Sequence, residues 1–285
     1  MAAPAPSTAV SESLLASSPS SAACVAPSSV QRAHPDRAPQ RRILTGHRLD
    51  DGSIFVYQAY KPSIGLEAVK RQNFAGIPGF STTRMTSVTH AETRAVTLTR
   101  APHSLCVVLD CLWHCFSWIK FSLGWMLYRC NYAQSRDQEV VLRIRLSAAA
   151  VDTILRAAVG STWNRRLYPT KSDWQAAMAR SEVRFQWDPE RDLSIVKFPH
   201  NQRALQLGLA KTVATRFATD PTWILSIEDC TAQAKAIKMA VDAGTPMPEV
   251  PLEQAIPIDD AELRRSLAMD LAAGEDEQEE EAPAK

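Results

Sequence analysis

The stretch Glu182-Val-Arg-Phe-Gln-Trp187 decides the fold class of this chain, because alternation of apolar and polar residues is typical of a half-buried β-strand. The apolar positions Val183, Phe185 and Trp187 would face a core, and the residues between them would face the opposite side. Asp188-Pro189 follows. Proline lacks the N–H that a strand ladder needs, so we expect the strand to end there.

Four further segments have the composition of strands or of strand–helix junctions. Residues 53–60 are rich in β-branched and aromatic side chains, and Asp50-Asp51-Gly52 before them is turn chemistry. This turn predicts a hairpin with a short strand around Ile43 and Leu44. The other three segments are 140–146, 204–209 and 223–228.

Helical segments alternate with these strands. Pro62 favours a helix start, and Ser147 is a good N-cap residue. Interleaved strands and helices with short connections predict a single α+β domain over residues 42–270, with a central antiparallel or mixed sheet. The predicted helices cover residues 64–71, 118–128, 147–158 and 231–241.

The two ends of the chain differ from this domain in composition. Residues 1–41 are rich in Ala, Ser and Pro and contain no aromatic residue, so they predict a disordered extension. Their Arg-containing, acid-poor composition also fits an organelle transit peptide, which stays an alternative. Residues 271–285 form an acidic tail, also predicted to be disordered.

Composition excludes some classes of protein. The net charge of +1 argues against a generally basic nucleic-acid binder. Residues 105–127 are apolar, but Asp110, His114 and Lys120 interrupt them, which favours a buried segment over a membrane span. Six irregularly spaced cysteines do not resemble a secreted disulfide framework. We therefore expect a cytoplasmic or nuclear protein, with organelle targeting as the alternative, and no membrane partner.

A metal site is not expected. Cys106, Cys111 and Cys115 lie near His103 and His114, but structural zinc sites pair their ligands, and a second pair is missing. No P-loop is present to hold the phosphates of ATP, and no Asp-Glu-x-His or Asp-Glu-x-Asp box is present, so helicase activity is excluded. The hydrolase and dinucleotide-binding motifs are missing as well.

Four short segments together resemble an uncharacterised bacterial and fungal family, domain of unknown function 4291. They are Val56-Tyr-Gln-Ala-Tyr60, Trp125-Met-Leu-Tyr-Arg129, Gln186-Trp-Asp-Pro-Glu-Arg191 and Gln206-Leu-Gly-Leu209. The resemblance implies a fold unit over nearly all of residues 42–270, without a chemistry. Similar chains run from an Arg-Met-Thr triplet almost directly into Trp-Ile-Lys. Here residues 87–116 intervene, and we interpret them as an insertion or a retained intron.

Cationic, amide and aromatic residues gather in these signature segments. Arginine forks match phosphate oxygens, aromatic faces stack on bases, and glutamine reads amides or sugar hydroxyls. We therefore predict a pocket for a nucleotide or another phosphate-bearing ligand. Core packing and local ion pairs are the alternative for each residue taken singly. The candidate ligand-binding residues are Gln58, Tyr60, Arg84, Thr86, Lys120, Arg129, Arg191, Arg203 and Gln206.

The order of elements is also similar to the first half of ADP-ribosyltransferase domains. That similarity implies matches at Gln58, Thr86 and Gln206, where such domains use Arg or His, Ser/Thr or Tyr, and Glu or Gln. Gln58 departs from the usual Arg or His, and Gln206 lacks the carboxylate of Glu, the more usual residue at the third position, which weakens the case for transfer chemistry. Two functions stay open: an NAD- or RNA-end-processing transferase-like enzyme, with NAD as the candidate cofactor, or a non-catalytic nucleotide- or RNA-binding module.

Overall fold

The computed structural model describes residues 41–80, 117–199 and 202–270, all within one compact unit of the chain. The predictions for residues 1–40, for Arg84, for Thr86, for the insertion 87–116 and for the acidic tail lie outside the described residues. So do the cysteines and histidines weighed above as zinc ligands.

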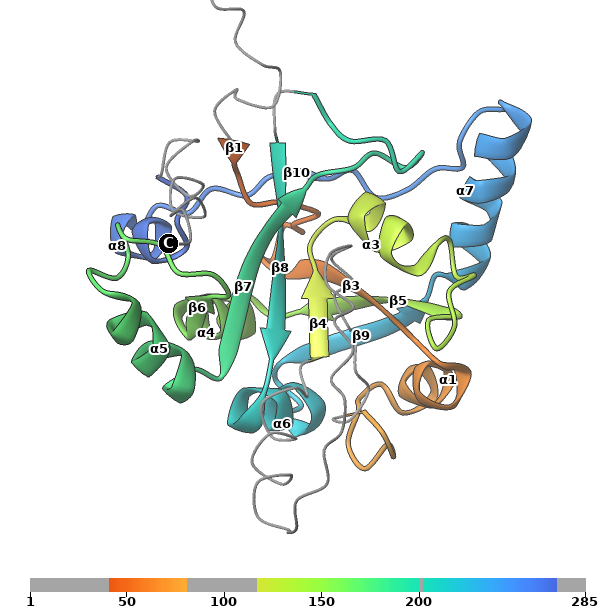
Figure 1. The fold of residues 1–285 in the computed structure, drawn as a ribbon. Coiled ribbons are helices and arrows are strands. Elements are labelled where there is room, and N and C mark those ends of the chain that lie inside the picture. The colour runs from red at the N-terminus through yellow and green to blue at the C-terminus, as the bar shows by residue number, and fades with distance from the viewer. Residues whose placement is uncertain (1–40, 81–116, 200–201, 271–285) are drawn as a thin grey trace, which may run out of the picture. The chain divides into compact units, whose positions relative to one another are not determined.

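A mixed sheet forms the centre of the domain and confirms the predicted α+β class (Figure 1). Most neighbouring strands are antiparallel, but β6 pairs with β7 in parallel, and β1 (Arg41–Arg42) pairs in parallel with the start of β8. The order across the sheet is β6 (Ala158–Gly160), β7 (Val183–Pro189), β8 (Gln202–Leu209), β4 (Ser117–Lys120), β3 (Ile54–Tyr60), β5 (Val140–Leu146) and β9 (Ile224–Asp229).

The predicted hairpin before β3 is only partly correct. The turn at Asp50-Asp51-Gly52 is present, and the Leu49 amide donates to the Ser53 carbonyl at 2.9 Å. However, Ile43 and Leu44 do not pair with β3. They lie between β1 and β2 (Thr45–Gly46), and β2 pairs instead with β10 (Gln254–Ala255). The upstream chain therefore ties the sheet to the C-terminal segment.

Seven helices are described. Those predicted at 64–71, 147–158 and 231–241 are confirmed with shifted ends, and the Ser147 side chain accepts the Ala150 amide as an N-cap. The sequence does not predict α5, whose residues are all at least partly exposed and which therefore lacks an apolar period. The helices are α1 (Pro62–Arg71), α3 (Leu123–Cys130), α4 (Ala148–Arg156), α5 (Lys171–Arg180), α6 (Lys211–Thr219), α7 (Thr231–Ala243) and α8 (Ala261–Ser266).

The helix predicted at 118–128 is wrong in its first half. Residues 117–120 form β4, which hydrogen-bonds to β3 on one side and β8 on the other. Ser122 then caps α3 by accepting the Trp125 amide. The aromatic and apolar residues of this segment fit the period of a helix and that of a strand. Pairing with the neighbouring strands makes residues 117–120 a strand. Lys120 is therefore a central-strand residue.

The strand β7 is longer than predicted. It continues through Asp188 and Pro189, and Pro189 is the register partner of Arg203 in β8. β6 pairs only with residues 183–185 of β7, so the other edge of β7 carries no ladder at Pro189. The missing proline N–H therefore removes no hydrogen bond from the sheet.

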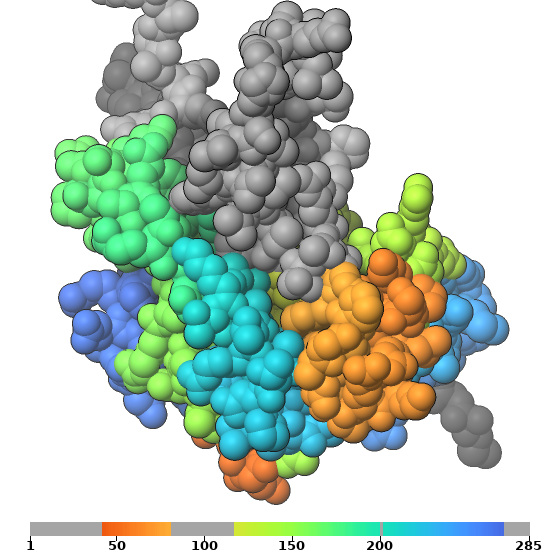
Figure 2. All heavy atoms as spheres, turned by 90° about the horizontal axis from the view of Figure 1, so that it is seen from below, coloured from red at the N-terminus to blue at the C-terminus, as the bar shows by residue number. Residues whose placement is uncertain are grey.

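Each face of the sheet carries its own hydrophobic cluster. The face we call the α1 face packs against α1, α4, α6 and α8, and the face we call the α3 face packs against α3 and α7. Figure 2 shows α6 beside α1 and the loop that follows α1. Phe74 in this loop stacks on Phe217 of α6. Among the helices in the described ranges, none has the length and apolar character needed to span a bilayer.

Candidate functional site

A row of mostly polar residues crosses the α3 face. Strand register makes Gln186 the partner of Gln206, Gln206 the partner of Lys120, and Lys120 the partner of Tyr57. Register partners project from the same face of a sheet, so four neighbouring strands contribute one line of side chains. We use the name α3-face cluster for Lys120, Gln186, Asp188 and Gln206, together with the nearby Arg129 and Arg191.

Lys120 is the least accessible charged residue of this cluster. Its exposed fraction is 1%, and no described residue accepts a hydrogen bond from its ammonium. Burial, together with the positive charge of Arg129, lowers the pKa of Lys120 to about 7, while Asp188 acts in the opposite direction. A buried ammonium without a hydrogen-bond partner is costly, and such groups are typical of functional sites.

Asp188 is held by two amides of the same face. Gln186 donates to its Oδ1 at 3.2 Å, and Gln206 donates to its Oδ2. The amide of Gln206 also reaches Gln186 Oε1 at 3.3 Å. Burial raises the pKa of Asp188 to about 6, against the effect of the surrounding cations. The cluster thus places an amine and a carboxyl that both titrate near neutrality within one buried region.

Cationic side chains outnumber the acids among the described groups that act on Asp188. Four cationic side chains act electrostatically on Asp188, and they are Lys120, Arg129, Arg203 and Arg191. Another nearby acid, Glu190, is already engaged, because its Oε1 accepts the Ser122 hydroxyl at 2.7 Å and the Arg191 amide at 2.9 Å. An anion at the cluster would balance this excess.

Aromatic side chains border the cluster on α3. The Arg191 guanidinium lies 3.5 Å from the ring centroid of Tyr128, and Tyr128 stacks on Trp125 with centroids 5.0 Å apart. Arg191 Nη1 donates to the Ile195 carbonyl at 2.7 Å, whereas its Nε is buried without a hydrogen-bond partner among the described residues. Tyr128 is 39% exposed, so one ring of this stack faces solvent.

The N-terminus of α3 binds two further carboxylates. The Leu123 amide donates to Glu253 at 2.6 Å, and Glu190 holds the capping residue Ser122. Burial, together with the negative charge of Glu190, raises the pKa of Glu253 to about 8. Gly124 lets the chain approach here, because a Cβ at this position would lie 2.1 Å from the Arg191 carbonyl oxygen. The Arg191 backbone is therefore packed directly onto α3.

The structure brings some predicted residues together and separates others. Lys120, Arg129, Arg191 and Gln206 gather on the α3 face. Gln58 does not join them, and this corrects the idea that Gln58 and Gln206 line one pocket. It follows Tyr57, the register partner of Lys120, so it projects from the opposite face of β3.

Gln58 and Tyr60 instead form a buried polar group on the α1 face. The amide of Gln58 donates to the Ser117 hydroxyl at 3.1 Å, and the Tyr60 hydroxyl lies 2.8 Å from the same oxygen. Burial raises the pKa of the Tyr60 hydroxyl beyond its usual range. This arrangement satisfies interior hydrogen bonds and presents no open ligand surface.

Arg203 lies on the α1 face as well, lining a separate cavity with Arg42 and Trp187. Arg84 and Thr86 lie outside the described residues, so the proposed trio of Gln58, Thr86 and Gln206 cannot be assembled from the described chain. No group of three or more His, Cys, Asp or Glu side chains suited to a metal occurs among the described residues.

Three carboxylates of the site do not appear among the sequence candidates. Glu190 is buried, Asp188 and Glu253 are partly buried, and burial raises the pKa of all three. A signal for Asp188 exists, because it continues the polar side of the alternating strand and is two residues from Gln186. Glu253 comes from a segment far along the chain, and no local pattern places it beside α3.

The chain matches one protein family. The sequence model described as "Domain of unknown function (DUF4291)" aligns with residues 45–91 and 112–256. The unmatched stretch between these ranges lies within the segment 87–116 that we interpret as an insertion. No curated protein matches the chain.

Proposed function

We propose that this chain, which belongs to the DUF4291 family, binds a nucleotide or another phosphate-bearing ligand at the α3-face cluster. The observation that carries the proposal is Lys120. It is a fully buried cation without a described hydrogen-bond partner, close enough to Arg129 for that charge to lower its pKa. A phosphate group would accept hydrogen bonds from both side chains and neutralise their mutual repulsion.

The surroundings of Lys120 support a nucleotide over a bare phosphate ion. Gln186 and Gln206 offer amide groups of the kind that bind sugar hydroxyls, and Tyr128 offers an exposed ring of the kind that stacks on a base. Arg191 lies between the polar side chains of the cluster and the aromatic rings of α3, because it stacks on Tyr128 and acts electrostatically on Asp188. NAD and a nucleic-acid phosphate end are the ligands to test first.

A second observation favours an enzyme over a passive binding module. Lys120 with a pKa of about 7 and Asp188 with a pKa of about 6 can both exchange a proton near neutral pH. A transferase-like enzyme acting on NAD or an RNA end would use such a pair. A non-catalytic nucleotide- or RNA-binding module is the alternative. Activity with a bell-shaped pH dependence between these two values would favour the enzyme.

The binding proposal is tested with a ligand panel. Melting temperatures are measured with NAD, ADP-ribose, ADP, a short 5′-phosphorylated RNA and adenosine, which lacks phosphate. We expect at least one phosphate-bearing compound to raise the melting temperature and adenosine to leave it unchanged, because a ligand that binds only the folded state stabilises it. No shift with any phosphate-bearing compound at millimolar concentration would contradict the proposal.

The position of the site is tested with one arginine and a matched control. Arg129→Ala removes a cation of the cluster, whereas Arg136→Ala removes an arginine whose side chain is 95% exposed. Hydrogen bonds to charged groups contribute about 1.5–3 kcal/mol, so Arg129→Ala should weaken binding about ten- to a hundredfold. Equal affinities in the two variants, measured by titration calorimetry, would exclude the cluster as the binding site.

A further inference from the structure

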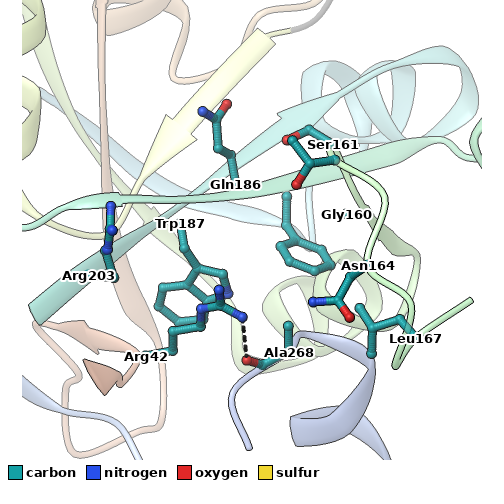
Figure 3. A pocket seen from close by; sticks show the side chains of 11 residues that line it. Arg42, Gly160, Ser161, Asn164, Leu167, Gln186, Trp187, Arg203 and Ala268 are labelled. Atoms are coloured by element: carbon teal, nitrogen blue, oxygen red, sulfur yellow. Dashed lines mark hydrogen bonds between the residues drawn. The ribbon is translucent and has the colours of Figure 1, made fainter. Parts of the chain in front are cut away.

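A second cavity lies on the α1 face, separate from the α3-face cluster. Its volume is about 220 Å³, and it is enclosed by β1, β7, β8, the segment that follows β6 and the residues after α8. Figure 3 shows that β7 divides the two regions, because the side chain of Gln186 projects away from the cavity while that of Trp187 faces it. Gln186 belongs to the cluster and also lines the cavity, but its side chain lies on the α3 face, so β7 lies between the cavity and the cluster.

Two arginines line this cavity side by side. Arg42 and Arg203 are register partners in the parallel pairing of β1 with β8, so their side chains leave the sheet on the same face. Arg42 Nη1 donates to the Ala268 carbonyl at 3.1 Å. Burial lowers the pKa of Arg42, and the positive charge of Arg203 lowers it further. Two guanidinium groups thus repel each other at the wall of a partly enclosed space.

The described lining offers hydrogen-bond donors and contains no carboxylate. Arg203 Nε is buried without a hydrogen-bond partner among the described residues. Ser161 and Thr162 add hydroxyl groups at the far wall, and no Asp or Glu occurs among the described residues that line the cavity. Arg203 also acts electrostatically on Asp188, whose side chain is on the α3 face.

The indole of Trp187 is fixed beside the arginines. Its Nε1 donates to the Leu267 carbonyl at 2.8 Å, which holds the ring against the residues after α8. Arg42 and Trp187 both line the cavity (Figure 3). Two guanidinium groups and nearby hydroxyl donors can bind the oxygens of a phosphate. The fixed ring of Trp187 can contact a small organic group attached to that phosphate.

We infer that this cavity is a binding site for a small phosphate monoester, gripped by Arg42 and Arg203. The volume supports a small ligand, because a water molecule occupies about 30 Å³ in the liquid and typical drug-sized pockets begin at about 300 Å³. The space takes a phosphate and one ring-sized group. A dinucleotide would not fit within it.

The inference is tested with ribose 5-phosphate on the full-length protein, with ribose and inorganic phosphate as companion probes. Arginine Nε–H signals are followed by ¹⁵N NMR, and the Arg203 signal is assigned by its loss in Arg203→Lys. We expect ribose 5-phosphate to shift that signal and ribose to leave it unchanged, because the buried Nε gains an acceptor. Inorganic phosphate should produce a smaller shift at the same concentration.

Affinity gives the second readout. Arg203→Gln should weaken ribose 5-phosphate binding at least tenfold in calorimetry, while Arg136→Gln should bind as the wild type does. Because the NMR signal reports on the wild-type protein, a folding defect in Arg203→Gln does not decide the outcome. An unshifted Arg203 signal at millimolar ribose 5-phosphate would overturn the inference, and so would equal affinity in the folded Arg203→Gln protein. The same calorimetric titration of Arg129→Ala shows which site binds ribose 5-phosphate. Affinity equal to that of the wild type indicates this cavity, and lower affinity indicates the α3-face cluster.

Discussion

Replacing Lys120 by methionine should stabilise the protein and remove its ligand affinity together. Methionine has a similar length and no charge, so it can fill the space without desolvating an ammonium. The pKa of Lys120 falls from 10.5 to about 7 on folding. At about 1.36 kcal/mol for each pH unit, that difference corresponds to a cost of about 5 kcal/mol for the charged form. Repacking recovers only part of it, and we expect a gain of about 2–4 kcal/mol at pH 6.

The gain should depend on pH in a defined direction. Below pH 7 both the folded and the unfolded protein carry the Lys120 proton, so the full cost is present. Between pH 7 and 10.5 only the unfolded chain keeps it, so the stability of the wild type rises with pH. The advantage of Lys120→Met should therefore be largest below pH 7 and shrink toward pH 10.

Chemical denaturation at several pH values measures this, with Lys235→Met as a control at an exposed position of α7. Affinity for the best phosphate-bearing ligand is measured in parallel and should fall at least tenfold. A lower stability in Lys120→Met would show that the ammonium is a structural group. Higher stability with unchanged affinity would show that the anion binds elsewhere. Either result refutes the reasoning.

Three further outcomes are expected. The stability of the wild type should fall from about pH 4.5 to about pH 8, because only the folded state keeps the Glu253 proton in that range. Glu253→Gln should reduce this fall, and chemical denaturation of both proteins at pH 5 and pH 8 measures it. Gly124→Ala should destabilise the fold by several kcal/mol or displace the chain at Arg191, seen as a lower melting temperature, and an unchanged melting temperature would contradict the close contact. Thr170→Ala should cost about 1 kcal/mol, because it removes the capping box of α5, whereas an unaffected protein would show that this helix end contributes nothing.

Much of the fold could be predicted from local pattern. The alternation in 183–187 and 140–146 has the period of a strand, and both strands are present. Ser147 and Pro62 mark helix starts for reasons of capping and backbone geometry, and both helices begin there. The ends of helices and strands were harder to predict where they depend on contacts with neighbouring strands. Residues 117–120 became a strand because β3 and β8 pair with them, which no local pattern reveals.

The site was harder to predict than the fold. Sequence spacing shows that Gln58 and Tyr57 point to opposite faces, but only the register with β4 shows which of them shares a face with Lys120. Composition suggested an anion site and identified Lys120, Arg129 and Arg191. It did not identify Asp188, because a residue before proline suggests a turn, and it could not bring Glu253 to α3.

The alternation along β7 has a consequence for how this protein can change in evolution. Gln186 and Asp188 serve one face of the strand, while Phe185 and Trp187 serve the other. Inserting or deleting a single residue within β7 would exchange the two sets, placing an indole among the cations and a carboxylate in the apolar cluster. Substitutions at any one of these positions leave the rest in place. The length of this strand should therefore vary less among homologues than its individual side chains do.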